Sequence, residues 1–441
     1  MCFLCYEANK FNTPSGNKVI DDFIRYTITN SSKNGGKMIF VPYDRFKNVE
    51  FIAEGGFSKI YKATCTDGLI IDWDVKMHKF NCKSEILVAL KELNNSKNIS
   101  SKELNELKIY YNINLKYTSP NVNKYYGITQ HPITQNFMII TEYHELGDLT
   151  HYVTNDFFNI SWKGKLEMLF GIAVGINKIH AANVIHKDYH TGNIFVSSSY
   201  TRTTTGDLGL SKSSLNDDED NEVYGIIPYV APEVLQGQNY TKASDIYSYG
   251  MIMWELMTGR RPFWDRNHDT DLIIEICDGF RPPIVTNAPE DYIELMQSCW
   301  HPDPNKRPIA EDLFLTFYNG KLNNVNERNK PTQIIETSDI GPITNKPGAI
   351  YKSRPLSAMI RSAESTRSLR SQNIHNNTLS INKRKFNNVL IKNNEKDEPI
   401  KRIKLFESDN DDYLTKELEL DIDDNKLDSN DYITEEINFD I

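Results

Sequence analysis

The chain has 441 residues, of which 39% are hydrophobic and 11% aromatic, and its formal net charge is −10. That length exceeds what one compact core usually covers, so we expect one domain of about 250–300 residues with polar segments outside it. The acidic balance argues against nucleic acid as the main partner of the whole chain, although local basic stretches can still act alone.

The N-terminal extension, residues 1–46, lacks the basic start and long apolar run of a secretion signal. The longest apolar stretch of the chain, 168–176, is too short to span a bilayer. We therefore expect a protein without a membrane span, cytoplasmic or nuclear in location. The six cysteines do not form a disulfide framework and fit reduced thiols.

Cys2 and Cys5 form a C-x-x-C pair that resembles half of a zinc knuckle. Tetrahedral zinc needs four ligands, and no second C-x-x-C pair lies nearby in the sequence. Two copies of the chain could share such a site. Two ordinary thiols are the favoured interpretation.

Sequence periodicity predicts two lobes in chain order. In the first lobe, at about 47–143, strands are expected at 51–63, 86–91 and 136–143, with one helix at 105–111. From Trp162 onward apolar residues recur at helical spacing, so the second lobe, at about 144–322, should be mainly helical. This is an α+β protein whose ligand is expected in the cleft between the lobes. A further helix is expected in the N-terminal extension near 19–27.

The segment past about residue 322 shifts to Asn, Ser, Lys and Asp with little periodicity, so we expect 323–441 to be disordered. Residues 351–405 hold 13 Lys/Arg against 4 Asp/Glu, whereas 406–441 hold 14 Asp/Glu against 2 Lys. Two solvated tails of opposite charge are one interpretation. A nuclear import signal or an anionic-surface patch at 383–385 and 401–404 is the other.

Polar residues between Val184 and Asp207 form the clearest chemical pattern of the chain. The run V-I-H-K-D-Y-H-T-G-N ends at Asn193, and D-L-G begins at Asp207. The carboxylates of Asp188 and Asp207 and the amide of Asn193 can orient a hydroxyl nucleophile and hold magnesium on the phosphates of a nucleotide. The pattern predicts a site for phosphoryl transfer.

Residues from about 47 to 320 resemble a eukaryotic protein kinase domain of the tyrosine-kinase-like group, since nearly every kinase signature occurs in order. The resemblance implies a bilobal fold with an antiparallel N-lobe sheet, ATP and Mg²⁺ as cofactors, and a protein as the phosphate acceptor. It also implies that Asp188 accepts the hydroxyl proton and that Asn193 and Asp207 bind magnesium. His186 should pack structurally against the D-x-G motif.

The phosphate loop, I-A-E-G-G-F-S-K-I-Y, departs from the kinase pattern G-x-G-x-x-G. Ala53 and Ser58 stand where the first and third glycines belong, and only the central glycine, Gly55, is kept. Backbone amides in such a turn can still cover phosphates, because glycine only allows close approach. The motif is weak alone and gains value from its position at the start of the sheet lobe.

Two lysines are candidates for the phosphate anchor, Lys76 in D-V-K-M and Lys91 in V-A-L-K. Lys76 is closer to the usual spacing after the loop. We choose Lys91, because 88–91 is the better strand and Glu106 is placed to be its ion-pair partner. Residues 67–84 then become an insertion. Either lysine could instead be a solvated charge on an edge strand.

The resemblance further assigns a pocket for the adenine base. Ala89 should line its roof with Ile60 close by, and Phe195 should close its floor. The run I-I-T-E-Y-H-E-L-G-D-L resembles the hinge between the lobes, with Thr141 as the gatekeeper. Backbone groups from Glu142 to His144 would hydrogen-bond the base.

The A-P-E motif at 231–233 resembles the end of a kinase activation segment. Glu233 should pair with Arg307, and Asp245 should brace the backbone of the catalytic loop. Lys187 replaces the arginine that usually holds an activation-loop phosphate. Our hypothesis is that the acidic residues between Asp217 and Glu222 partly replace this phosphate; a solvated acidic loop is the alternative.

Acceptor specificity is the least determined property of the chain. His190 and Ile226 stand where serine/threonine kinases usually place lysine and threonine, and Pro228-Tyr229 lacks the tryptophan context of tyrosine kinases. A serine/threonine kinase of intracellular signalling is favoured on overall resemblance. The alternative is a pseudokinase or scaffold that binds nucleotide without transfer, motivated by the changed phosphate loop and by Lys187.

Overall fold

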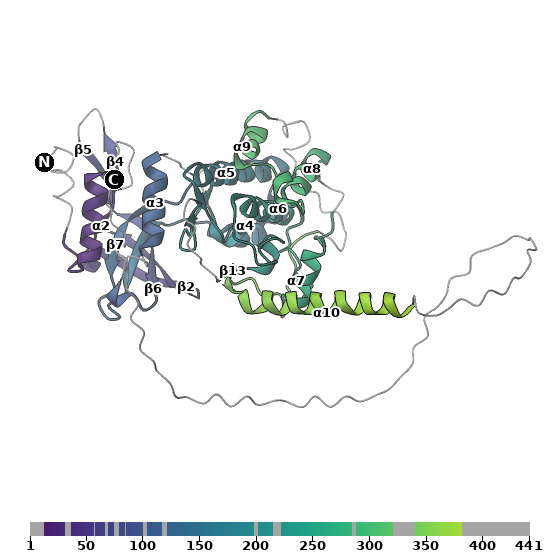
Figure 1. Ribbon diagram of the computed structural model, residues 1–441. Coiled ribbons are helices and arrows are strands. Elements are labelled where there is room, and N and C mark those ends of the chain that lie inside the picture. The colour runs from purple at the N-terminus through teal and green to yellow at the C-terminus, as the bar shows by residue number, and fades with distance from the viewer. Residues whose placement is uncertain are drawn as a thin grey trace, which may run out of the picture. The chain divides into compact units, whose positions relative to one another are not determined.

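The computed structural model describes residues 13–30, 37–56, 58–66, 69–74, 79–83, 85–99, 104–116, 121–197, 202–214, 222–284, 288–320 and 340–381. A sheet-rich N-lobe is followed by a mainly helical C-lobe, as the sequence predicts (Figure 1). Cys2, Cys5, Lys76, the acidic run 217–220 and the charged segments after 381 lie outside the described residues.

The described part of the N-lobe contains a six-stranded sheet in the order β1-β7-β8-β6-β3-β2. Its neighbours pair antiparallel, except β1 and β7, which are parallel. Burial alternates along β6, because successive side chains of a strand point to opposite faces. The strands are β1 Ile39–Phe40, β2 Phe46–Glu54, β3 Ser58–Cys65, β6 Ile86–Leu93, β7 Tyr125–Gln130 and β8 Phe137–Glu142.

Two helices accompany this sheet. The sequence predicts one of them in the lobe itself and the other in the N-terminal extension. Helix α3, Asn105–Lys116, is the one in the lobe, and α2, Lys18–Thr29, comes from the N-terminal extension. The side chain of Asn17 caps α2, which buries Ile20 and Ile24. Since β1 also joins the sheet, the extension is structurally part of the N-lobe and not a separate segment.

The predicted insertion at 67–84 is a β-hairpin where the structure describes it. Its strands, β4 Leu69–Asp74 and β5 Lys79–Lys83, pair antiparallel outside the main sheet. The hairpin explains why the spacing between the phosphate loop and Lys91 is longer than usual. It adds residues between β3 and β6 without changing the register of these two neighbours.

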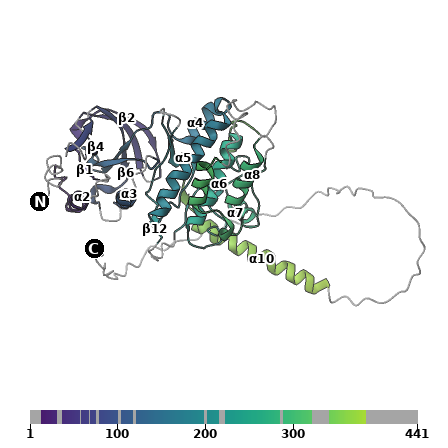
Figure 2. The same ribbon diagram turned by 90° about the horizontal axis from the view of Figure 1, so that it is seen from above.

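Helix α6 forms the centre of the C-lobe, because its sequence is apolar around most of its circumference and every residue from Ser244 to Thr258 is buried. The other helices pack around it (Figures 1 and 2). The C-lobe helices are α4 Leu149–Asp156, α5 Trp162–Ala181, α6 Lys242–Thr258, α7 Thr270–Cys277, α8 Glu290–Cys299 and α9 Ala310–Tyr318. Short strands between them are β9 Val184–Ile185, β10 Ile194–Val196, β11 Thr203–Thr205, β12 Lys212–Ser213 and β13 Tyr224–Gly225.

Helix α5 contains the run G-I-A-V-G, whose last glycine, Gly175, packs against the backbone at Asn121. A Cβ at Gly175 would lie 2.7 Å from the backbone oxygen of Asn121, so this position requires close approach. The run therefore serves close packing in a buried helix. Within the described residues, no helix is long and apolar enough to cross a membrane.

The expectation of disorder from 323 onward is wrong for residues 340–381. They include β14 Arg354–Pro355, which pairs with β13, and α10 Ser357–Ile381, which packs on α7 (Figure 1). Leu356, Ile360 and Ala363 are buried against the C-lobe at helical spacing. These three apolar residues lie in a long polar segment and hardly change its mean hydropathy. The composition of the segment therefore did not reveal them.

Lys165 of α5 is fully buried between aromatic rings. Its Nζ lies 4.0 Å from the ring centre of Phe157 and 4.9 Å from that of Trp162. Among the described residues it has no hydrogen-bond partner. Burial lowers the pKa of Lys165 to about 7, since the apolar surroundings disfavour the charged form.

Replacing Lys165 with methionine should stabilise the protein at pH 7 by about 1–3 kcal/mol, because it removes a buried cation without a hydrogen-bond partner. The folded-state pKa lies below the unfolded value of about 10.4, so the unfolded chain binds more protons between pH 7 and 10. Wild-type stability should therefore rise from pH 7 to pH 9, and Lys165→Met should reduce that rise. Urea unfolding at both pH values measures this.

Lys163 provides the matched control, since it lies on the same helix with a half-exposed side chain. Lys163→Met should leave both the stability and its pH dependence within about 0.5 kcal/mol of wild type. A Lys165→Met protein that loses stability equally at both pH values would show that the ring contacts outweigh the cost of burial.

Candidate active site

Lys91 of β6 contacts carboxylates from two other parts of the chain. Its Nζ lies 2.8 Å from Oε2 of Glu106 on α3 and 2.6 Å from Oδ1 of Asp207. The hydroxyl of Tyr125 donates to the other Glu106 oxygen at 2.7 Å, so both oxygens of this carboxylate are engaged. The ion pair with Glu106 is the one that the sequence predicts.

The charges of this triad stabilise one another. Burial alone would lower the pKa of Lys91, but the carboxylates of Asp207 and Glu106 outweigh it and raise that pKa. Burial would raise the pKa of Asp207, yet the Lys91 ammonium holds it below its ordinary value. Burial dominates at Glu106 and raises its pKa despite Lys91. The Asp207 side chain is 44% exposed, so it presents its charge to the pocket.

The catalytic loop runs from β9 to β10 and holds Asp188 and Asn193 together. The Asn193 amide nitrogen donates to the backbone oxygen of Asp188 at 2.9 Å. Nε2 of His190 lies 3.6 Å from Oδ2 of Asp188. Burial would raise the pKa of Asp188, but the charge and hydrogen bond of His190 and a hydrogen bond from Ser353 bring it below its ordinary value. Asp188 is therefore a carboxylate at neutral pH.

Asp245 of α6 holds the backbone of the same loop. Its two carboxylate oxygens accept the backbone N–H groups of His186, at 2.8 Å, and of Lys187, at 3.0 Å. The His180 ring contacts it at 2.8 Å. Lys187 has a φ of 72°, a left-handed conformation that is strained for this residue type and is maintained by such bonds. The brace is the one that the sequence predicts.

His186 connects the catalytic loop to the segment before Asp207. It is fully buried, and its Nε2 lies 3.0 Å from the backbone oxygen of Gly206. Asp207 follows with a φ of 53°. A structural role for His186, as expected, agrees with these contacts, because the ring fixes the residue next to a strained position.

A pocket of about 450 Å³ brings many of the predicted residues together. Its lining includes Gly55, Ser58, Lys91, Glu106, Asp188, Asn193 and Asp207. A second set does not line this pocket and lies on the neighbouring strands, the hinge and the start of the C-lobe: Ala53, Ile60, Ala89, Thr141, Glu142, His144 and Phe195. The described pocket is thus the phosphate and acceptor side of the predicted site.

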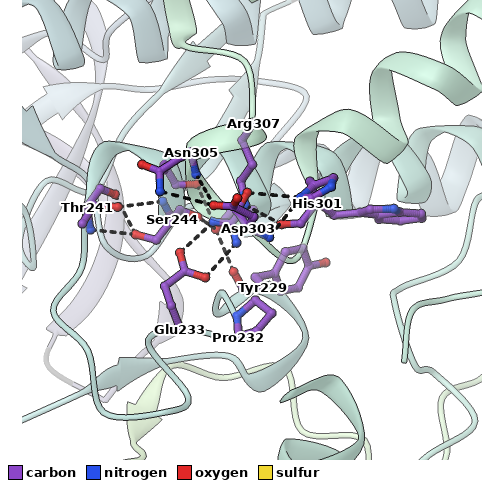
Figure 3. A network of polar contacts seen from close by, with 12 residues as sticks. Tyr229, Pro232, Glu233, Thr241, Ser244, His301, Asp303, Asn305 and Arg307 are labelled. Carbon is purple, nitrogen blue, oxygen red and sulfur yellow. Dashed lines mark hydrogen bonds and ion pairs between the residues drawn. The ribbon is translucent and has the colours of Figure 1, made fainter. Parts of the chain in front are cut away.

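Glu233 and Arg307 form a buried bidentate pair behind the site (Figure 3). Both terminal guanidinium nitrogens donate to the Glu233 carboxylate at 2.7 Å. The guanidinium also donates to the backbone oxygens of Ala243 and His301, each at 2.9 Å. The pair thus ties the end of the activation segment to two parts of the C-lobe.

Comparison with known families agrees with this geometry. A family model described as protein tyrosine and serine/threonine kinase matches residues 46–317, which is more than half of the chain. The chain belongs to this protein kinase family. The bilobal α+β fold expected from the sequence is that of the family.

Curated relatives of several kinds match parts of the chain. A putative serine/threonine-protein kinase/receptor of Acanthamoeba polyphaga mimivirus is 33% identical over 40% of this chain. A probable serine/threonine-protein kinase of Dictyostelium discoideum is 28% identical over 61%, and ephrin type-B receptor 1 of Gallus gallus is 31% identical over 68%. The matched segments make up 11%, 15% and 29% of these proteins.

The residues expected around the base are neighbours in the sheet of the kinase domain. Ala89 pairs with Thr141 across β6 and β8, and Ile60 pairs with Lys91 across β3 and β6. The Glu142 N–H donates to the backbone oxygen of Lys124 at 2.9 Å, so its carbonyl is the group that could accept from a base.

The side chain of His144, whose backbone is expected at the base, makes contacts of its own. Its ring stacks on Phe195 at 5.2 Å and hydrogen-bonds Asn123 and Ser197. Burial, with a smaller contribution from the charge of Arg202, lowers the pKa of His144 to about 4. The ring is therefore neutral and stacks on Phe195.

Sequence reasoning missed several residues of the kinase site. Tyr125 fixes Glu106, and the pattern of β7 does not distinguish this tyrosine from a core residue. Tyr351, Lys352 and Ser353 line the pocket from a segment that was expected to be disordered. Only their place in the folded chain identifies them.

The acidic hypothesis for the activation segment stays a prediction. Lys187 extends over the ring of Tyr240, with Nζ 5.6 Å from its centre. Of the acidic residues, Glu222 is described and exposed, whereas 217–220 lie outside the described residues.

Replacing Arg307 with alanine should lower the free energy of unfolding by about 3–5 kcal/mol, because Glu233 would remain as a buried carboxylate without its partner. Arg307→Lys should recover only part of this loss, since a lysine cannot donate through two parallel nitrogens. Urea or thermal unfolding followed by circular dichroism measures the change.

Arg266 and Glu275 offer a matched control on the surface. One Arg266 nitrogen contacts both Glu275 oxygens, at 2.7 and 2.6 Å, but the side chains are 37% and 39% exposed. Arg266→Ala should therefore cost about 0–1 kcal/mol. Equal losses for Arg266→Ala and Arg307→Ala would contradict the structural weight given to the buried pair.

Proposed function

We propose that the chain is an active protein kinase that transfers the γ-phosphoryl group of ATP to hydroxyl groups of proteins, with serine and threonine as the preferred acceptors, in signalling. The single observation that carries the proposal is the grouping of Lys91, Glu106, Asp188, Asn193 and Asp207 around one pocket. A loose phosphoryl-transfer transition state needs positioning and charge compensation, which this set can supply.

Asp188 would accept the acceptor's hydroxyl proton and orient its oxygen. The lowered pKa of Asp188 supports this role, because only the ionised carboxylate can accept a proton. Lys91 would hold the phosphates, positioned by Glu106. The pocket of about 450 Å³ lies within the usual size of small-molecule sites.

Asn193 and Asp207 fit a magnesium ion. Both face the pocket, and both can offer the oxygen ligands that this hard cation prefers. The Asp207 carboxylate already holds a cation, the Lys91 ammonium, at 2.6 Å, so its position and ionisation suit positive charge. Because the Asn193 nitrogen is engaged with Asp188, its amide oxygen is the atom that would ligate the metal. A bound magnesium would neutralise charge on the phosphates.

Serine/threonine preference is supported by two relatives that are described as serine/threonine-protein kinases, whereas the matching family model covers tyrosine kinases as well. The pseudokinase alternative remains motivated by Ala53, Ser58 and Lys187. The presence of Asp188 beside Lys91, Glu106, Asn193 and Asp207 argues for activity, since a domain that only binds nucleotide has no task for the carboxylate that accepts the hydroxyl proton.

Asp188→Asn in the full chain should reduce phosphate transfer by roughly 10²–10⁴-fold, because a neutral amide cannot accept the proton. Mg-ATP binding should persist, since the phosphate-side residues are unchanged. Purified wild type and variant, incubated with ATP, Mg²⁺ and a generic basic protein, are compared by mass spectrometry of all phosphorylated residue types. Wild type that binds Mg-ATP but transfers nothing would establish the pseudokinase alternative.

Lys91→Met and Lys76→Met form a matched pair of variants that decides between the two candidate anchors. Lys91→Met should remove transfer, since the phosphates lose their cation and Glu106 loses its partner. Lys76→Met should retain wild-type transfer. Initial rates at saturating ATP provide the comparison, and the reverse ranking would move the anchor to Lys76.

A further inference from the structure

The segment 340–367 follows the C-lobe and passes through the acceptor side of the pocket. Before the pocket, the Gly341 N–H donates to the backbone oxygen of Thr258 at 2.7 Å, and the His268 N–H donates to that of Gly348 at 2.9 Å. After it, the Leu356 N–H donates to the backbone oxygen of Val223 at 2.7 Å. The segment is therefore anchored on both sides of the site.

Within this segment Ser353 meets the catalytic carboxylate. Its hydroxyl donates to Oδ2 of Asp188 at 2.5 Å, and Tyr351, Lys352 and Ser353 all line the pocket. The Lys352 side chain also reaches the phosphate loop, 3.9 Å from where a Cβ on Gly56 would lie. The hydrogen bond between Ser353 and Asp188 places a serine hydroxyl at the position that an acceptor must occupy.

The residues flanking Ser353 are held in a defined register. The Tyr351 hydroxyl donates to the backbone oxygen of Pro262 at 2.8 Å, and the Arg261 guanidinium stacks 3.8 Å from the Tyr351 ring centre. Arg354 donates to the backbone oxygen of His268 at 2.6 Å. Strand β14 then pairs antiparallel with β13 of the activation segment. Such fixation on both sides gives the near-attack placement that an acceptor needs.

We propose that Ser353 is an acceptor of phosphoryl transfer within its own chain, an inference that rests on the proposed kinase activity. The Ser353 oxygen forms a bond to the γ-phosphorus of ATP, and the bond from that phosphorus to the oxygen bridging to the β-phosphate breaks. ADP leaves with that oxygen. The hydroxyl proton passes to the Asp188 carboxylate and from there to solvent.

The product differs from the substrate in charge. A phosphate on Ser353 would lie beside the carboxylate of Asp188, in a pocket that Asp207 also lines, and like charges in a partly buried site repel. The phosphorylated stretch 350–355 therefore leaves the pocket and opens it for another acceptor. Until then, this stretch occupies the place of a protein substrate.

The test uses the full 441-residue chain with ATP, Mg²⁺ and a generic basic protein, with phosphorylated sites mapped over time. Ser353 should be labelled at a rate per molecule that does not change over a hundredfold range of chain concentration. Ser353→Thr should move the label to threonine, and Ser353→Ala should remove it. Ser365→Ala, on the exposed side of α10, is the matched control and should leave the labelling of Ser353 unchanged.

A mixing experiment separates transfer within the chain from transfer between chains. A full chain carrying Asp188→Asn, mixed with an active chain carrying Ser353→Ala, should stay unlabelled at its own Ser353. Labelling of that serine at the wild-type rate would overturn the proposal. Phosphate on the added protein but none on Ser353 would overturn it and leave the kinase function standing, whereas no transfer to any acceptor would remove both.

Hydrogen exchange gives a readout that needs no nucleotide. Ser353→Glu should raise the exchange rate of the backbone amides at 350–354 by on the order of tenfold or more, because the added charge faces Asp188. Ser365→Glu should not. Unchanged protection in Ser353→Glu would contradict the release of the stretch by charge.

Discussion

The interaction on which the site depends is the single Lys91 ammonium held by two carboxylates from separate elements. Desolvation of three charged groups is costly, and only good geometry offsets it. The sheet register must therefore place Lys91, and α3 must present Glu106 at 2.8 Å. Tyr26 of α2 packs edge-on against Tyr111 of α3 at 5.7 Å, so the N-terminal extension helps to set the position of that helix.

Buried carboxylates perform the corresponding task in the C-lobe. Asp245 holds the start of the catalytic loop by its backbone N–H groups. Glu255 accepts the hydroxyls of Thr191 in the catalytic loop and Tyr229 in the activation segment, so one acid joins the two loops. Glu233 joins the activation segment to Arg307. Because each acid bonds to several loop groups at once, the loops keep one arrangement although they have little regular structure.

Local patterns in the sequence were sufficient to predict several of these contacts. Strand alternation around Lys91 and the helical stretch around Glu106 predicted their pairing, and the signature order predicted the Glu233–Arg307 pair. The patterns failed where function depends on a few residues in a polar context. Three buried residues hold the segment after β14, and neither they nor the hydroxyl of Ser353 produce a periodic signal. Such contacts arise from the path of the chain over an already folded surface, which composition does not encode.

The two parts of that segment are held by interactions of different strength. Burial of Leu356 and Ile360 contributes about 1.5–3 kcal/mol for each side chain, whereas a hydrogen bond such as that of Ser353 contributes about 0.5–1.5 kcal/mol net. The stretch 350–355 is held by several such polar contacts, including those of Tyr351 and Arg354, and the charge of a phosphate on Ser353 would release it while the anchor after it stays bound. A stretch tethered in this way returns with an effective concentration on the order of millimolar. Under the proposed kinase activity an external protein substrate would compete with this stretch for the pocket, so the affinity for a substrate would depend on both.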